Sequence, residues 1–142
     1  MADISDIEAA YAEYMTELKL AGPNWEKKPA AGKEGEAAWC AKEVAEHVAS
    51  AGGFFGMSIA KAAGHADVPS PARPSFATAD EAFAGTPAEH AKVVAAAVHV
   101  TPEQAAMETE FGPLGKTTIG AVLGVVSYHL RDHAGQLKAL RG

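Results

Sequence analysis

The chain has 142 residues, 48% of them apolar, and carries a formal net charge of −6 at pH 7. A chain of this length and composition fits one globular domain, which we expect to span residues 1–142. Its acidic charge, with no cluster of Lys and Arg to neutralise phosphates, argues against nucleic-acid binding.

Two helices are predicted in the first half of the chain. Ser5-x-x-Glu8 is a capping-box pattern, and apolar residues then recur every three or four positions, which predicts a helix over about residues 5–21. A second helix is expected over about residues 36–63, weakened or kinked by Gly52-Gly53. The connection over residues 22–35 is long for a bundle hairpin, so these helices need not be antiparallel neighbours.

Start signals organise the next part of the chain. The proline-rich stretch 65–78 cannot be continuous helix, and Thr78-x-x-Glu81 predicts a short helical piece after it. Thr86-Pro87-Ala88-Glu89 combines an N-cap Thr, a Pro at the first helical position and a Glu at the third, and predicts the start of the third long helix. Thr101-Pro102-Glu103-Gln104 repeats this signature for another short turn.

The last helix follows a glycine-rich connection. Residues 108–116 are expected to form a loop or extended crossing. A fourth long helix is predicted from Thr117 or Thr118 to about Leu140. No strand pattern is convincing. The sequence therefore predicts an all-α fold, a four-helix bundle with short extra helical turns in its connections.

Three histidines lie on apolar stripes of these helices. His129 and His133 are four residues apart, a spacing at which two imidazoles can converge on one ion at about 2.0–2.1 Å each. The alternative is one core and one surface histidine. His47 lies on the inward stripe of the second helix, and bundle cores are where facing helices assemble metal sites. Three nitrogen donors would leave a coordination position open, as in reactive zinc sites.

Two polar neighbours are candidates for supporting the histidines. Glu43 lies one turn before His47, and Gln136 lies three residues after His133. Ligating histidines usually donate their second N–H to such groups. Glu43 is also a candidate general base for a bound water; its alternative is an exposed glutamate on the helix face.

Other residues are weighed as core or surface. Trp39 is expected to be core or pocket wall. Cys40 lies about 10 Å along the helix from the nearest candidate ligand and is expected to be a small core residue. His65 and His90 are expected to be solvated, the latter in the first turn of the third helix. His99 is expected to end that helix, and its alternative is to line the pocket.

Several features predict a cytoplasmic protein. The first residues lack the basic and apolar regions of a signal peptide, and no apolar run is long enough to cross a bilayer. A single cysteine excludes an internal disulfide and fits a reducing cytosol.

The motifs Trp39-x7-His47-Val48 and His129-x3-His133, the second followed by Gly135-Gln136-Leu137, occur in the order that a known group shows. In these features the chain resembles the DinB/YfiT-like superfamily of small metal-binding four-helix bundles, related to the N-terminal domains of mycothiol-dependent maleylpyruvate isomerases. The resemblance implies an up-down-down-up bundle, often a homodimer. It also implies a divalent metal, zinc or nickel, on His47, His129 and His133, with water completing the shell.

The resemblance further implies a metal-dependent enzyme that acts on a low-molecular-weight thiol or thiol conjugate, as an S-transferase or isomerase with a small-molecule substrate. A metal-dependent hydrolase is an alternative, because zinc can also ionise water. A non-catalytic metal-binding or stress-associated bundle is another. A plain interaction bundle, with core or interface histidines, is the last.

Overall fold

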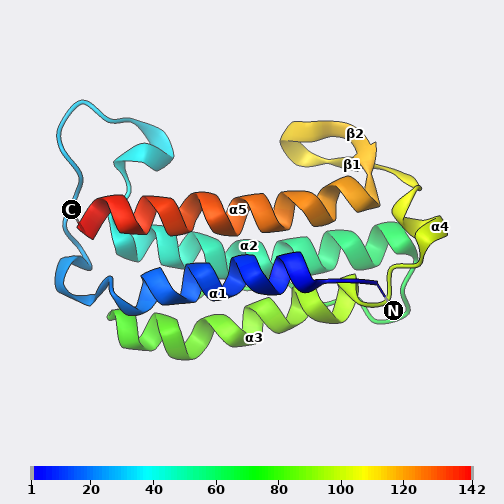
Figure 1. The fold of residues 1–142 in the computed structure, drawn as a ribbon, viewed down its shortest axis with the longest axis horizontal. Helices are drawn as coiled ribbons and strands as arrows, with labels where there is room; N and C mark the ends of the chain where they lie inside the picture. Colours follow the sequence, from blue (N-terminus) through cyan, green and yellow to red (C-terminus); the bar gives the residue numbers. More distant parts are fainter. Residues whose placement is uncertain (1, 142) are drawn as a thin grey trace.

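The computed structural model describes residues 2–141, apart from the side chain of Pro113. Within this part of the chain four long helices dominate, joined by a short helix, three 3-10 turns and one β-hairpin (Figure 1). The elements are α1 Ser5–Lys19, η1 Gly22–Asn24, η2 Gly35–Ala38, α2 Ala41–Ala63, α3 Ala79–Ala97, α4 Pro102–Ala105, β1 Glu108–Phe111, η3 Gly112–Leu114, β2 Gly115–Thr118 and α5 Ile119–Arg141.

The long helices form an up-down-down-up bundle. In Figure 1, α1 and α5 run in one direction and α2 and α3 in the other. The most extensive contacts join the parallel pairs, α2 with α3 and α1 with α5, while α5 also packs on α2 and α1 on α3. The predicted fold class is confirmed, and the long connection 20–40 carries the chain from α1 to α2.

The capping box predicted at the start of α1 is wrong. Ile4, not Ser5, is the N-cap residue, and no side chain caps the helix there. The Ser5 backbone N–H instead donates to the Asp3 carboxylate at 2.9 Å. The Glu8 carboxylate accepts a hydrogen bond from His90 on α3. A tertiary partner has therefore taken the glutamate that the local pattern assigned to the cap.

Helix α2 begins five residues later than predicted. Trp39 and Cys40 have extended backbones, and Cys40 is the N-cap residue. Glu43, at the third helical position, accepts the Cys40 backbone N–H at 3.1 Å and so fixes the start of the helix. The preceding residues 35–38 form the 3-10 turn η2 instead of a first helical turn.

The glycines of α2 do not break it; they let α3 approach closely. A Cβ on Gly52 would lie 3.1 Å from the Glu89 carbonyl oxygen, and one on Gly56 would lie 2.7 Å from that of Lys92. Side chains at these positions would push the two helices apart. The prediction of a weakened or kinked helix missed this packing role.

Helix α3 begins at its cap Thr78, so the predicted start at Thr86 is wrong. Thr78 Oγ1 accepts the Glu81 backbone N–H at 3.1 Å. Thr86 and Pro87 lie inside the helix, where the Thr86 hydroxyl donates to the Ala82 carbonyl at 2.6 Å. Pro87 costs one backbone hydrogen bond, but the turns before it bury apolar residues in the core and the helix continues through it.

The expected loop at residues 108–116 is a β-hairpin, with Phe111 of β1 opposite Gly115 of β2. Gly112 and Gly115 have φ values of 39° and 63°, which suit glycine in the tight connection. Phe111 is buried and stacks on Phe55 of α2, with ring centroids 5.5 Å apart. The hairpin is thereby fixed against the bundle.

The other two predicted starts are confirmed. Thr101 Oγ1 accepts the Gln104 backbone N–H at 3.1 Å, and the Gln104 side chain accepts the Thr101 N–H at 2.9 Å, a complete capping box for α4. Thr118 Oγ1 accepts the Ala121 N–H at 3.1 Å at the start of α5.

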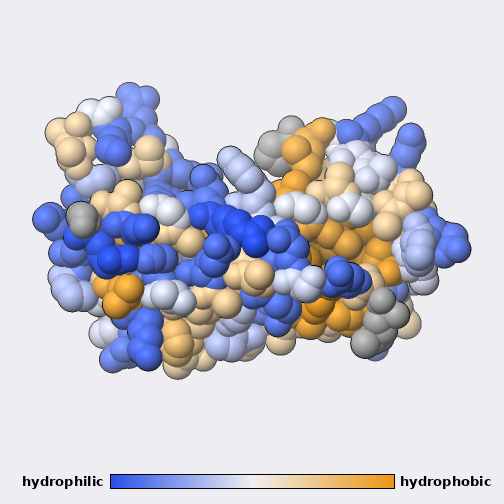
Figure 2. All heavy atoms as spheres, in the orientation of Figure 1, coloured by the Kyte–Doolittle hydropathy of each residue, from blue (hydrophilic) through white to orange (hydrophobic). Residues whose placement is uncertain are grey.

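A continuous core fills the bundle. Its largest fully buried apolar side chains include Tyr14, Leu18, Ile59, Ile119 and Leu137. On the face shown in Figure 2, polar residues cover the half that holds the C-terminal end of α5, while apolar residues gather toward the α4 end. Within residues 2–141, no helix is both long and apolar enough to cross a membrane.

Candidate metal centre

The three histidines singled out in the sequence come together between α2 and α5. His47 lies on α2, and His129 and His133 lie one turn apart on the antiparallel α5. One ring nitrogen of each lies within 4.8 Å of those of the other two. The closest pair, His47 Nε2 and His129 Nε2, is 2.8 Å apart. His133 is fully buried, and the other two are partly buried.

A chain of hydrogen bonds places a proton on Nδ1 of His133. The Gln136 amide nitrogen donates to the Glu36 backbone carbonyl at 2.6 Å, and a carbonyl can only accept. The Gln136 amide oxygen therefore faces His133, whose Nδ1 lies 2.8 Å away and is assigned as the donor. In the neutral imidazole this leaves Nε2 with its lone pair, the form that binds a metal ion.

Burial keeps the other two rings neutral. Burial, together with the neighbouring His133 and His47, lowers the pKa of His129 to about 3. The pKa of His47 is lowered by burial and by His133, against an opposing effect of the Glu36 carboxylate. Metal ligation requires neutral imidazole, and both rings are in this form at pH 7.

This donor set fits a divalent transition metal. A single proton between His47 Nε2 and His129 Nε2 would satisfy that pair but not His133 Nε2, whereas one cation satisfies all three. Nitrogens that share a tetrahedral ion at about 2.0–2.1 Å lie roughly 3.4 Å apart. Small rotations of the imidazoles are therefore enough to accommodate an ion.

The other residues predicted for the site lie around this cluster. Trp39 packs on the rings of His47 and His133, with centroid separations of 4.9 Å and 6.4 Å. Cys40 is buried at the helix cap and is not one of the clustered donors. Glu43 bonds to the Cys40 N–H and forms an ion pair with Lys28. These contacts are those of a helix cap, and a role for Glu43 at the metal stays a prediction.

Comparison with protein families assigns the chain to one of them. A family model described as the DinB superfamily matches residues 5–137. The chain belongs to the DinB superfamily. This superfamily is metal-binding, in agreement with a cluster of three histidines that could hold an ion. Neither the comparison with curated proteins nor that with solved structures gives a match.

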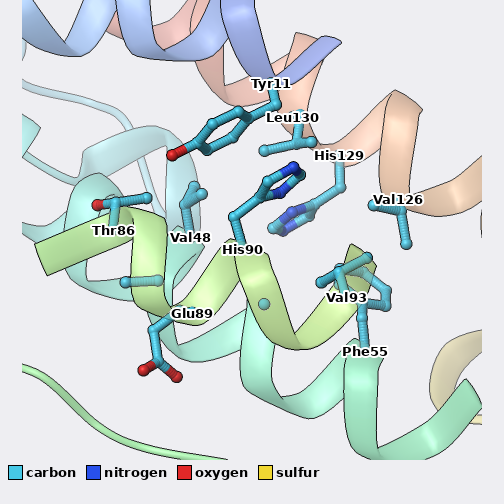
Figure 3. Close-up of a pocket in the computed structure, with 12 residues that line it drawn as sticks. Tyr11, Val48, Phe55, Thr86, Glu89, His90, Val93, Val126, His129 and Leu130 are labelled. Carbon is cyan, nitrogen blue, oxygen red and sulfur yellow. The ribbon is translucent and has the colours of Figure 1, made fainter. Parts of the chain in front are cut away.

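A cavity of about 20 Å³ lies deeper in this DinB bundle, next to His129, with room for about one water molecule. His129 and His90 both turn toward it, from α5 and α3 (Figure 3). His90 was expected to be solvated, and this is wrong: it is buried, its Nε2 donates to Glu8 Oε1 at 2.6 Å, and its ring stacks on Tyr11 at 3.6 Å. The late predicted start of α3 explains the error, because it placed His90 in a first turn.

The two remaining histidines lie elsewhere. His65 is partly buried rather than solvated, and His99 is exposed just after the end of α3. Their ring centroids are 6.3 Å apart, and both line a groove that is separate from the three-histidine cluster.

The structure adds one residue to the site that the sequence did not indicate. Glu36, in η2, places Oε1 3.5 Å from His133 Nε2, and its backbone carbonyl is held by Gln136. Glu36 was expected at the start of the second helix, and no motif in the sequence indicated its contact with His133. Its position depends on the path of the connection from α1 and on a partner 100 residues away.

The cluster lies between a wall of aromatic side chains and a surface groove. On one side Phe55 meets the His129 ring at 5.4 Å, and Phe111 of the hairpin packs against Phe55 and the exposed Phe54. On the other side a surface groove of about 570 Å³ runs between residues 29–37 and α5. Figure 1 shows the hairpin and this segment projecting from the same side of the bundle, near opposite ends of α5.

Proposed function

We propose that this DinB protein is a metal-dependent enzyme that uses a divalent zinc or nickel ion on His47, His129 and His133 to act on a low-molecular-weight thiol or its conjugate. The observation that carries the proposal is the convergence of three imidazoles, with Nε2 of His133 turned toward the other two because Gln136 holds Nδ1. Three nitrogen ligands leave a coordination position for a substrate.

The surroundings of the cluster support a small-molecule substrate. The groove beside it is lined by charged side chains, among them Lys33 and Glu36, which suits a polar compound such as a thiol bearing carboxylate or amino groups. The aromatic wall of Phe54 and Phe111 suits the apolar part of an electrophile that is joined to the thiol or released from it.

The chemistry divides between the ion and the chain. A divalent ion bound here supplies Lewis acidity, which lowers the pKa of a thiol or water bound to it. Gln136 orients the His133 ring and holds its proton on Nδ1. Trp39 packs on His47 and His133 and limits the rotation of their rings. The burial of His133 excludes water from one side of the cluster.

We also propose a cytoplasmic location, which a buried free cysteine and a thiol substrate both suit. A homodimer is proposed from the superfamily resemblance, and size-exclusion chromatography with light scattering tests it.

The first test of the function is thiol binding to protein loaded with Co²⁺ as a spectroscopic substitute. Cysteine and glutathione serve as probes. We expect an absorption band from thiolate-to-cobalt charge transfer in the wild type, its loss in His129→Ala, and its retention in His90→Ala. Turnover is then measured with zinc- or nickel-loaded protein, a small thiol and an activated aryl halide.

The outcomes separate the alternatives. Ester hydrolysis without thiol binding would replace the proposal with a hydrolase. Stoichiometric metal with neither activity would favour a non-catalytic metal-binding bundle. Protein that takes up no metal at neutral pH would contradict both, and the histidines would then be core or interface residues.

A further inference from the structure

We propose that Glu36 is a fourth ligand of the ion held by the three histidines, which makes this a three-nitrogen, one-carboxylate site. The inference rests on the proposed metal function and deepens it. It concerns a residue outside the two helices that carry the histidines.

The argument begins with which face of His133 the carboxylate approaches. A carboxylate that only supports a ligating histidine accepts a hydrogen bond from the ring N–H that points away from the metal. In this protein Gln136 fills that place, on Nδ1 at 2.8 Å. Glu36 Oε1 instead faces Nε2, the nitrogen left to bind the ion. Glu36 therefore lies on the metal side of the ring.

The second step concerns the two facing atoms. In the neutral ring, His133 Nε2 presents a lone pair, and an ionised carboxylate can only accept. Two acceptors that face each other at 3.5 Å repel unless a proton or a metal cation lies between them. Glu36 thus places negative charge beside His133. Its carboxylate lies outside the group of three ring nitrogens that approach within 4.8 Å of one another, so it has to turn toward an ion to join them.

The separation itself matches shared coordination. Zinc binds histidine nitrogen at about 2.0–2.1 Å and carboxylate oxygen at about 2.0–2.2 Å, so two such donors on a tetrahedral ion lie roughly 3.4 Å apart. The separation of 3.5 Å between Glu36 Oε1 and His133 Nε2 agrees with this value. It is longer than an ordinary N–H···O hydrogen bond, which spans about 2.7–3.2 Å.

The segment that carries Glu36 is anchored at the site. Gln136 holds the Glu36 backbone carbonyl at 2.6 Å, and Trp39, three residues on, packs against two of the histidines. The Glu36 side chain itself is 59% exposed and can adjust its carboxylate toward an ion without disturbing the core. It also lines the groove proposed for the substrate. A substrate thiol would then either displace this ligand or add to it.

Metal binding by the full-length protein tests the inference without any activity assay. We would compare the wild type with Glu36→Gln and Glu36→Asp, using Glu34→Gln as the matched control, because Glu34 is an exposed glutamate in the same connection. Zinc dissociation constants are measured by competition with a chelating dye, and Co²⁺-loaded proteins by visible absorption. We expect Glu36→Gln to bind zinc about 10- to 100-fold more weakly and to change the cobalt spectrum. Glu36→Asp should lose less, and Glu34→Gln should change neither.

Three results would overturn the inference. One is wild-type affinity and spectrum in Glu36→Gln, with metal lost in His129→Ala; the three histidines would then bind alone and the proposed function would stand. Another is weaker binding with an unchanged spectrum, which identifies Glu36 as a nearby charge only. The last is a wild type that binds no metal, which removes the proposed function as well. Metal-free unfolding curves of each variant verify that it is folded.

Discussion

Core histidines lie in two places in the bundle, His90 beside α1 and the three-histidine cluster between α2 and α5, and their ring nitrogens have different partners. On the side of α1 and α3, buried His90 has a protein partner: it donates to Glu8 at 2.6 Å and stacks on Tyr11. Between α2 and α5, the histidines face one another, with His47 Nε2 and His129 Nε2 2.8 Å apart. The protein itself supplies the hydrogen-bond partner of His90. The ring nitrogens of the other three histidines are arranged so that one metal ion could bind them all.

The contacts of the buried ring nitrogens distinguish a structural histidine from a candidate metal ligand. Burial lowers the pKa of His90 too, but its hydrogen bond to Glu8 opposes the shift. For His129, burial and two neighbouring imidazoles all act in the same direction, to a pKa of about 3. The distinguishing observation is therefore what the buried nitrogen faces, more than the burial itself.

The largest expected effect is on metal content. His129→Ala should lose the ion, with an affinity reduced by more than about 100-fold, because a direct ligand matters at least as much as its supporting contacts. His90→Ala should still bind about one equivalent. Elemental mass spectrometry of both proteins, purified without chelator, checks this. Equal metal in the two variants would remove the distinction between the groups.

Removal of the metal should come next in size. An ion present at about 1,000 times its dissociation constant stabilises the folded state by about 4 kcal/mol, or roughly 10 °C in Tm for a domain of this size. Differential scanning calorimetry with and without a chelator should show this drop in the wild type. His129→Ala, which lacks the site, serves as the control and should unfold at one temperature in both conditions.

A smaller effect is expected from the structural histidine. His90→Ala should lower the free energy of unfolding of the metal-free protein by about 2–3 kcal/mol, because it removes a buried ring and its hydrogen bond to Glu8. Urea denaturation measures this. Glu8→Gln keeps the ring and should cost less. An unchanged stability in His90→Ala would mean that the pair with Glu8 has no structural role.

The smallest predicted effect is the pH dependence of the metal-free protein. The folded-state pKa of His129, about 3, lies below its unfolded value of about 6.5, so only the unfolded state gains a proton as the pH falls below about 6.5. Stability should therefore fall by roughly 1–2 kcal/mol between pH 7 and pH 5. Urea denaturation at several pH values measures the slope, which His129→Gln should reduce. A flat profile in the wild type would contradict the pKa assignment.

The parts of the molecule that the sequence could predict depend on local spacing. The fold class, α5 and the three converging histidines all follow from periodicity at three and four residues. The start of α3 could not be predicted in this way, because Thr86-Pro87 is a complete local signature that tertiary burial overrides. The hairpin was missed because its two strands have only four residues each.

The part of the site outside the helices required the structure. Gln136 was expected near His133 and does contact it, since both lie on one helix. Glu36 reaches the same histidine from a connection whose path no periodic pattern describes. His90 was misjudged because its surroundings depend on α1, which lies far from it in the sequence.

The separation of the histidines along the chain has a topological consequence. His47 and His129 are 82 residues apart, so an ion on both would act as a removable cross-link that closes a long loop. The loop would enclose α3 and the hairpin but not α1, which precedes both ligands. Loading and unloading the site would then restrict or release the chain segment that carries the aromatic wall of Phe54, Phe55 and Phe111. Residues 29–37, which line the groove, and α1 lie outside this loop, and α1 could still fray from its N-terminal end.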